Sequence, residues 1–256
     1  MLLNHRPTKI LVTGNSGCGK STFYTRYLLN SPQTFKFVFD HEGEFGYRNG
    51  LPTAKTPDEL LAAVERKWII FDPVKEFPGR TLEAFEFFTE WTFNLSEKLP
   101  GTKLFACDEL QTIVDVHDTP PGLRLILETG RRQGIDTILV TQQPNIVHNR
   151  VRNQLTEVVA FSQVDENAVK FLESLGFDGE EVRQLSPGKF VLFDLRRRRW
   201  QRGDVFAKKM VQSYWAPNQN ASSGGLERRK SPAPPAQTDF RPSEDSPPAG
   251  QGNQNA

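Results

Sequence analysis

Residues 9–30 read KILVTGNSGCGKSTFYTRYLLN, and this stretch decides the fold that the rest of the chain completes. Its first part, KILVTG (9–14), is a short apolar run typical of a strand buried on both faces of a parallel sheet. Its last part, STFYTRYLLN (21–30), has the pattern of a helix. Between them, Gly14 to Ser21 satisfy the spacing G-x-x-x-x-G-K-[ST]. A strand, this loop and a helix in that order predict a nucleotide-binding α/β domain.

The loop supplies the groups that bind a triphosphate. Its glycines let successive backbone N–H groups face inward, and the following helix N-terminus adds a favourable dipole. We expect Lys20 to act catalytically by neutralising the β- and γ-phosphate oxygens, and Ser21 to hold Mg²⁺. The residues predicted to bind ATP are Gly14, Asn15, Ser16, Gly17, Cys18, Gly19, Lys20, Ser21 and Thr22.

A second motif, KLFACDELQ (103–111), is an apolar run that ends in two adjacent acids. Asp108 is predicted to orient Mg²⁺, and Glu109 to act as the base that polarises the attacking water. Two further apparent strands, 35–40 and 68–72, lie between the loop and this motif. The arrangement resembles the branch of P-loop NTPases that uses a catalytic glutamate, a branch that contains motors.

The remaining pattern predicts the whole architecture. Apolar runs alternate with helical segments, of which TPDELLAAVERK (56–67) carries an N-cap threonine followed by proline. The stretch GKFVLFDLRRRRWQRGDVFA (188–207) reads as a terminal hairpin. We therefore predict an α/β, RecA-like P-loop NTPase with a mostly parallel sheet, helices on both faces and a C-terminal β-hairpin. Other expected strands are 136–142, 157–163 and 189–195, and other expected helices are 81–98 and 120–133.

A third motif, GRRQGIDTILVTQQP (130–144), places two arginines before a buried strand and a glutamine at its end. An amide such as that of Gln142 can sense the γ-phosphate, and a guanidinium on an exposed helix end can reach the nucleotide of a neighbouring subunit. Arg131 and Arg132 are both candidates for that arginine finger, and the choice between them stays open.

The order of these motifs resembles the FtsK/HerA superfamily of ring-forming DNA translocases, over residues 8–206. Within it, a motor that starts this close to the N-terminus looks like the genome-packaging ATPases of tailless, internal-membrane-containing icosahedral phages. The resemblance implies ATP and Mg²⁺ as cofactors, a homo-oligomeric, hexameric ring and double-stranded DNA pumped into a preformed capsid. It further implies capsid or membrane proteins of a packaging vertex as partners, in the host cytoplasm or at that vertex.

Other functions fit the same motifs. Zot-like ATPases for the assembly and export of filamentous phages share the arginine-rich turn, although they usually carry a transmembrane segment. A P-loop kinase would need an acceptor-binding lid, which the GRR turn could mimic. Other DNA motors and a weak structural ATPase at a capsid vertex remain further alternatives, since the fold alone does not fix the function.

Composition bounds the domain organisation. The chain has 256 residues, a formal net charge of +1 and two cysteines, which fits a reducing compartment and leaves any DNA-binding surface as a local patch. The sequence contains neither a signal peptide nor a long apolar segment. We expect a motor domain at 1–215 and a disordered Pro-, Gly-, Ser- and Asn-rich tail at 216–256.

One dense basic cluster occurs before that tail. Arg196 to Arg199 are followed by Trp200 and Arg202. In a hairpin, alternate arginines could contact DNA phosphates. They could equally be charges that protect an edge strand and never touch DNA.

Overall fold

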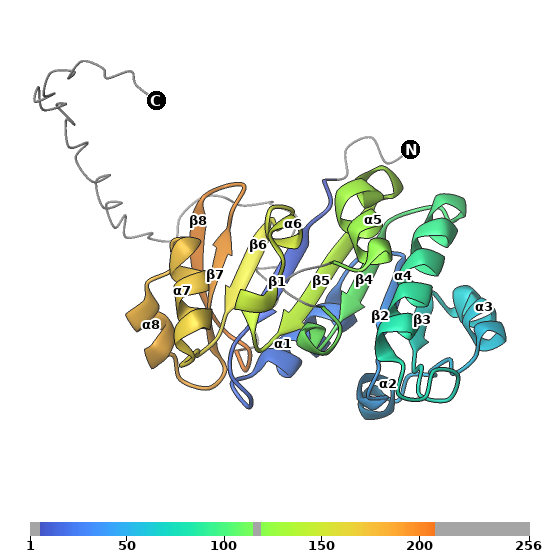
Figure 1. The fold of residues 1–256 in the computed structure, drawn as a ribbon, viewed down its shortest axis with the longest axis horizontal. Coiled ribbons are helices and arrows are strands. Elements are labelled where there is room, and N and C mark those ends of the chain that lie inside the picture. The colour runs from blue at the N-terminus through green and yellow to red at the C-terminus, as the bar shows by residue number, and fades with distance from the viewer. Residues whose placement is uncertain (1–5, 115–118, 208–256) are drawn as a thin grey trace, which may run out of the picture. The chain divides into compact units, whose positions relative to one another are not determined.

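The computed structural model of the chain describes residues 6–114 and 119–207 (Figure 1), so the predicted tail at 216–256 lies outside the described residues. The strands are β1 (Lys9–Thr13), β2 (Phe35–Phe39), β3 (Trp68–Phe71), β4 (Lys103–Cys107), β5 (Ile135–Thr141), β6 (Glu157–Ala160), β7 (Lys189–Asp194) and β8 (Arg199–Asp204). The α-helices are α1 (Lys20–Asn30), α2 (Glu44–Asn49), α3 (Pro57–Arg66), α4 (Thr81–Lys98), α5 (Pro121–Thr129), α6 (Asn149–Arg152), α7 (Glu166–Ser174) and α8 (Gly179–Gln184). Short 3₁₀ helices are η1 (Leu110–Thr112), η2 (Gly130–Gln133) and η3 (Pro144–Ile146).

The described strands form one sheet in the order β3-β2-β4-β5-β1-β6-β7-β8. The six strands from β3 to β6 in this order run parallel, β7 runs antiparallel to β6, and β8 pairs with β7 as a hairpin. The predicted parallel sheet with a C-terminal hairpin is thus confirmed. Strand β5 lies between β1 and β4, so the carboxyl ends of all three strands meet at one edge of the sheet.

Helices cover both faces of this sheet, as the apolar runs predict. On one face, the side chains of α1 and α2 pack over β1, β2, β4, β5 and β6. On the other, α3, α4, α5, α7 and α8 cover a core rich in phenylalanine, and Figure 1 shows α4, α5 and α7 in front of the strands. The central position of β1 illustrates the burial, because Leu11 faces Leu139 of β5 and Val158 of β6 and is itself fully buried.

Local signals set the boundaries of several elements. The Thr56 hydroxyl accepts a hydrogen bond from the Glu59 N–H at 3.3 Å, and Pro57 occupies the first turn of α3. The helix predicted over 120–133 ends earlier than expected. Helix α5 stops at Thr129, and the chain continues as the 3₁₀ helix η2 up to Gly134, whose φ of 70° ends it. This break lets the chain turn directly into β5.

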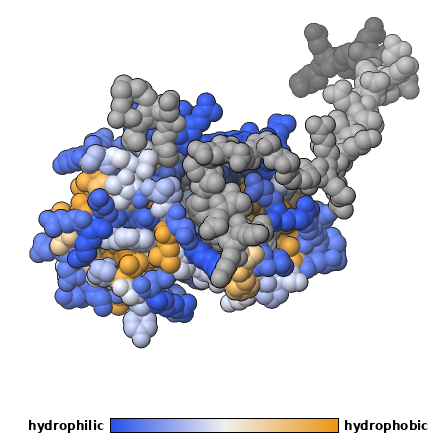
Figure 2. Space-filling view, turned by 180° about the vertical axis from the view of Figure 1, so that it is seen from behind, coloured by the Kyte–Doolittle hydropathy of each residue, from blue (hydrophilic) through white to orange (hydrophobic). Residues whose placement is uncertain are grey.

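The surface is mostly hydrophilic. On the visible part of the face opposite to that of Figure 1, hydrophobic residues gather only in a few small groups (Figure 2). Among the described residues, no helix is both long and apolar enough to cross a bilayer.

Candidate functional site

The glycine-rich loop joins β1 to α1 and has the backbone that its sequence requires. Gly14, Gly17 and Gly19 have φ values of 154°, 72° and 113°, which side chains disfavour. A Cβ at Gly14 would lie 2.6 Å from the Cβ of Phe161. Helix α1 begins without a side-chain cap and without an acidic residue in its first turn. Its first N–H groups and its dipole are therefore available to an anion.

The lysine of the loop is held at its centre. The ammonium group of Lys20 donates a hydrogen bond to the carbonyl oxygen of Asn15 at 2.6 Å, and the residue is only 7% exposed. The Asn15 N–H in turn donates to the Ser162 carbonyl at 2.8 Å, which fixes the loop to the end of β6. A positive charge is thereby held within the loop, at the start of α1.

The two acids of the second motif follow β4 directly, and both line a pocket with Ser21. Burial raises the pKa of Asp108 to about 6, against the lowering effects of its hydrogen bond from the Glu109 N–H, at 2.8 Å, and of the charge of Lys20. The negative charge of Glu109 raises that pKa further. The structure thus brings together Ser21 and Asp108, which the sequence predicts as metal ligands.

The side chain of Glu109 is held by two glutamine amides. Gln142 Nε2 donates to Glu109 Oε1 at 3.0 Å, and Gln111 Nε2 donates to Glu109 Oε2 at 2.8 Å. The Gln111 Oε1 atom accepts the backbone N–H of Gln142 at 3.1 Å, so the three residues form a closed network. We call Gln111 and Gln142 the glutamine clamp. Glu109 also has a left-handed backbone, with φ of 52°, which is uncommon for a residue other than glycine.

Sequence reasoning identifies Gln142 but misses the other two glutamines of this network. Gln163, after β6, donates to the Gln142 carbonyl at 2.9 Å and to the Thr13 hydroxyl at 3.3 Å. It is 1% exposed, which is unusual for a glutamine. For Gln111, the available signal is its position two residues after Glu109, on a turn that also follows the strand.

The pocket beside the loop has a volume of about 110 Å³ and extends over the acidic turn that follows β2. The Asp40 carboxylate fixes this turn by accepting the N–H groups of Phe45 at 3.1 Å and Gly46 at 2.9 Å. The lining residues are Ser21, Tyr24, Thr25, Phe39, Asp40, His41, Glu42, Glu44, Phe45, Arg48, Asn49, Asp108 and Glu109.

These residues fit a hydrated Mg²⁺ ion. The Tyr24 hydroxyl lines the pocket, is buried and has no hydrogen-bond partner within the described part of the chain. Burial, aided by the charge of Asp108, raises the pKa of Tyr24 well above its usual value, so the hydroxyl is a neutral donor or acceptor. Residues 6–114 and 119–207 contain no group of three or more His, Cys, Asp and Glu that could hold a metal. Mg²⁺ would then take most of its ligands from phosphate and water, as it usually does.

The two candidate finger arginines lie away from this pocket. Arg131 and Arg132 belong to η2, which precedes β5, whereas Gln142 directly follows β5. At roughly 3.3 Å per residue, the seven residues of β5 separate the two ends by about 20 Å. Both arginines are exposed, and neither has an ion-pair partner among the residues that the structure describes. The structure therefore does not bring them to the loop of the same chain.

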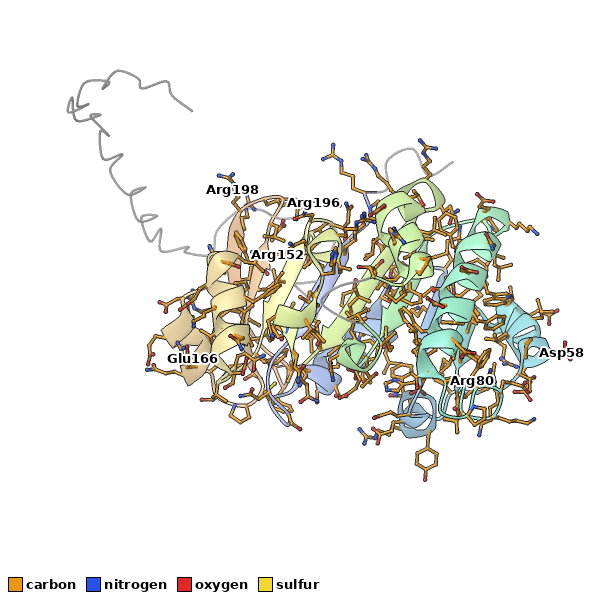
Figure 3. All side chains as sticks on the ribbon, viewed as in Figure 1. Asp58, Arg80, Arg152, Glu166, Arg196 and Arg198 are labelled. Carbon is orange, nitrogen blue, oxygen red and sulfur yellow. The ribbon has the colours of Figure 1, made fainter. Side chains whose placement is uncertain are left out.

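The basic cluster lies at the tip of the β7–β8 hairpin, at the same edge of the sheet as η2. Figure 3 shows Arg196 and Arg198 at that edge. Arg196 donates to the Pro7 carbonyl at 2.6 Å, and Arg197 lies 3.5 Å from the carboxylate of Asp194. Arg198 occupies the turn with φ of 51°. Part of the cluster is thus used within the chain, and Arg198 and Arg199 are exposed.

The sheet order and the loop geometry define the class of protein. The phosphate loop follows β1, a central strand of the parallel sheet, and the acidic pair follows β4, which β5 separates from β1. This arrangement is that of a P-loop NTPase fold. No protein-family model matches the chain. No curated protein matches it either.

Among solved structures, the chain is similar to the genome packaging NTPase B204 from Sulfolobus turreted icosahedral virus 2. The complex of B204 with sulfate has a TM-score of 0.64 and 18% identity, over 77% of this chain and 96% of that one. The complex with AMPPCP has a TM-score of 0.63 and 18% identity, over 77% and 97%. EssC (ATPases 2 and 3) from Geobacillus thermodenitrificans has a TM-score of 0.50 and 15% identity, over 81% of this chain and 42% of that one.

The chain therefore shares the P-loop NTPase fold of the B204 genome packaging NTPase and of EssC. The predicted RecA-like α/β architecture is confirmed, and so is the suspected resemblance at the level of the fold. At these identities the likeness concerns the fold, and the activity has to be argued from the site.

Proposed function

We propose that this protein is an ATP-hydrolysing motor that translocates double-stranded DNA, with packaging of a viral genome into a preformed capsid as its task. One observation carries the proposal of hydrolysis. Glu109, a carboxylate beside the phosphate loop, is held on both oxygens by the amides of Gln111 and Gln142. A carboxylate fixed in this way is suited to accept a proton from water.

Each residue of the pocket has a role in this reaction. Lys20 and the N–H groups of the loop bind the phosphates and neutralise their negative charge. Glu109 orients the attacking water and takes its proton, while Gln142 is placed to exchange its bond with Glu109 for one with the γ-phosphate. When bound, Mg²⁺ would be held by Ser21 and Asp108 and would stabilise the charge that develops on the phosphate oxygens.

The position of the arginines supports a ring. Because η2 lies at the sheet edge opposite to the phosphate loop, Arg131 and Arg132 can complete only the site of another subunit. A head-to-tail contact that brings this edge to the next subunit's loop closes into a cyclic oligomer when the rotation allows it. We propose a homo-oligomeric ring, in keeping with the hexamer that the resemblance implies.

The proposed substrate and partners follow from the same edge and from the structural neighbours. The exposed Arg198 and Arg199 carry positive charge that suits DNA phosphates. The similar B204 structures are described as a genome packaging NTPase and a DNA-packaging ATPase. We therefore propose capsid or membrane proteins of a packaging vertex as docking partners, and the host cytoplasm or that vertex as the location.

Phosphate release with and without double-stranded DNA tests the proposal. Stimulation of hydrolysis by linear double-stranded DNA supports a motor. A rate of hydrolysis that DNA does not change indicates a structural ATPase. Transfer of the γ-phosphate to an organic acceptor indicates a kinase. Stimulation by the single-stranded genome of a filamentous phage, but not by duplex DNA, would favour the export function instead.

A further inference from the structure

An exposed aromatic side chain lies beside the phosphate loop, on the side away from the acidic pair. Phe206 follows β8 and is 62% exposed. Its backbone is nevertheless fixed, because its N–H donates to Asp204 Oδ1 at 2.8 Å and the preceding Val205 is 1% exposed. The Val205 carbonyl also accepts a hydrogen bond from the Arg26 side chain of α1. A rigid backbone thus presents a large apolar ring to solvent.

Gly188 connects this ring to the phosphate loop. Its N–H donates to the Cys18 carbonyl at 2.8 Å, and its carbonyl accepts the Val205 N–H at 2.9 Å. A Cβ at Gly188 would lie 2.4 Å from Cε2 of Phe206, so the ring packs directly over this glycine. A Cβ at Gly19 would lie 3.2 Å from the Gly188 Cα. The loop, Gly188 and Phe206 therefore form one continuous surface.

The direction of a bound nucleotide follows from the sheet order. The groups that act on the γ-phosphate, Glu109 and Gln142, follow β4 and β5, on one side of β1. A triphosphate that lies along the loop with its γ end toward these residues carries its nucleoside toward the other side of β1. That side holds β6, β7 and β8, and the carboxyl-terminal end of β8 leads directly into Phe206.

We propose that Phe206 is the base-stacking residue of the nucleotide site, with the flat ring of a purine lying against its exposed face. Phenylalanine binds a nucleobase by stacking and by burial of apolar surface. The inference rests on the proposed nucleotide site, and it adds the part of that site that recognises the base rather than the phosphates.

Calorimetric titration of the full chain with Mg·ATP and with Mg·tripolyphosphate tests the inference, because tripolyphosphate has no base. Phe206→Ala is expected to weaken ATP binding by about 5- to 150-fold, the range that base stacking gives. The same variant should bind tripolyphosphate as the unmodified protein does. Phe206→Trp should restore ATP binding. Val74→Ala, an exposed hydrophobic residue after β3 at the other edge of the sheet, serves as the control.

The outcomes separate this inference from the proposed function. If the unmodified protein binds neither ATP nor tripolyphosphate, the proposed nucleotide site is refuted. If it binds both, and Phe206→Ala binds ATP with unchanged affinity, only the base-stacking assignment is overturned. Equal weakening of ATP and tripolyphosphate would also overturn it, since Phe206 would then act through the shape of the loop. A change in oligomeric size with unchanged ATP affinity would assign Phe206 to a contact between copies.

Discussion

The side-chain amide of Gln142 donates a hydrogen bond to the carboxylate of Glu109 at 3.0 Å, across the gap between the ends of β5 and β4. This bond joins the residue suited to sense the γ-phosphate to the residue suited to activate water. In the proposed function, a phosphate oxygen that competes for the Gln142 amide would leave the Glu109 carboxylate with one of its two amide donors. The remaining donor, Gln111, then decides where the carboxylate points.

Glu109→Gln should reduce ATP hydrolysis by about 10²- to 10⁴-fold, the usual contribution of a general base, and leave ATP binding intact. The change keeps the size of the side chain but removes its ability to accept a proton. Phosphate release and calorimetric titration measure the two effects. Glu83→Gln, an exposed change on α4, is the control. Full hydrolysis in Glu109→Gln would exclude this residue as the base.

Gln111→Ala should lower kcat by about 10-fold with little change in KM, because a misplaced catalytic group affects the reaction more than the binding. Gln111→Glu should be worse, since a second carboxylate would lie beside Glu109. A steady-state titration with ATP measures both constants. A lower melting temperature with unchanged kcat would show that Gln111 only supports the fold.

The pKa of Asp108, raised to about 6 by burial, predicts a pH dependence. Below pH 6 the carboxyl group is protonated, so Mg²⁺-dependent binding of ATP should weaken as the pH falls through this value. Calorimetric titration with Mg·ATP between pH 5 and pH 8 checks the expectation, with tripolyphosphate in EDTA as the control for the loop alone. An affinity that stays constant over this range would contradict it.

The carboxyl group of Asp108 should also lower the free energy of unfolding of the nucleotide-free protein. Its native pKa lies above the usual value of 3.8, so the folded state binds more protons and its stability falls as the pH rises from about 4 to about 6. Asp108→Asn should therefore raise the melting temperature at pH 7.5, by an amount that corresponds to at most about 3 kcal/mol, and abolish hydrolysis. An Asp108→Asn protein that melts lower than the unmodified one would refute this.

Arg131→Ala should leave ATP binding intact and reduce hydrolysis by about 10³- to 10⁵-fold, as removal of an arginine finger does. Because the finger is expected to act between subunits, a mixture of Arg131→Ala and Lys20→Ala proteins should recover part of the activity. A boundary is complete where the Arg131→Ala subunit supplies the intact loop and the Lys20→Ala subunit supplies the intact arginine. A second mixture, of Arg132→Ala with Lys20→Ala, shows by comparison which of the two arginines acts. If neither mixture recovers activity, action between subunits is excluded.

Neutralising Arg198 and Arg199 together should reduce the slope of log affinity for duplex DNA against log salt by about 2, close to 0.9 for each phosphate contact. Arg202→Ala is the matched control, since its guanidinium is paired with Glu181 at 2.8 Å. Fluorescence anisotropy at several salt concentrations gives the slopes. An unchanged slope would show that these arginines do not contact DNA phosphates. Their role would then be to protect the edge strand β8 from pairing with other chains.

Much of the fold could be predicted from the sequence because its strands are buried on both faces. Runs such as those at β1 and β5 are apolar at consecutive positions, and this signal survives without any tertiary information. The helix predicted over 120–133 is too long as an α-helix, because α5 stops at Thr129 and the chain continues as the 3₁₀ helix η2, a change of helix type that apolar spacing does not show. The phosphate loop and the acidic pair were visible because their residues are close in sequence.

The glutamine clamp could not be predicted in the same way. Gln111 and Gln142 lie 31 residues apart and meet only because β4 and β5 are neighbours. Gln163 joins them from the end of β6, on the other side of β1. A polar residue after a strand is usually solvated, and only the strand order shows that three such residues share one site. The position of Arg131 at the other end follows instead from the length of β5, which separates it from Gln142.

Strand β5 carries Gln142 immediately after its last residue, and the arginine pair precedes it by a single turn. All seven of its residues are buried, and close packing makes it a stiff rod. In a ring, one end of this rod would contact a subunit's own γ-phosphate and the other end the nucleotide of the next subunit. Loss of the phosphate at one site would thus be transmitted through β5 to the neighbouring site. The subunits of the proposed ring would then hydrolyse ATP one after another.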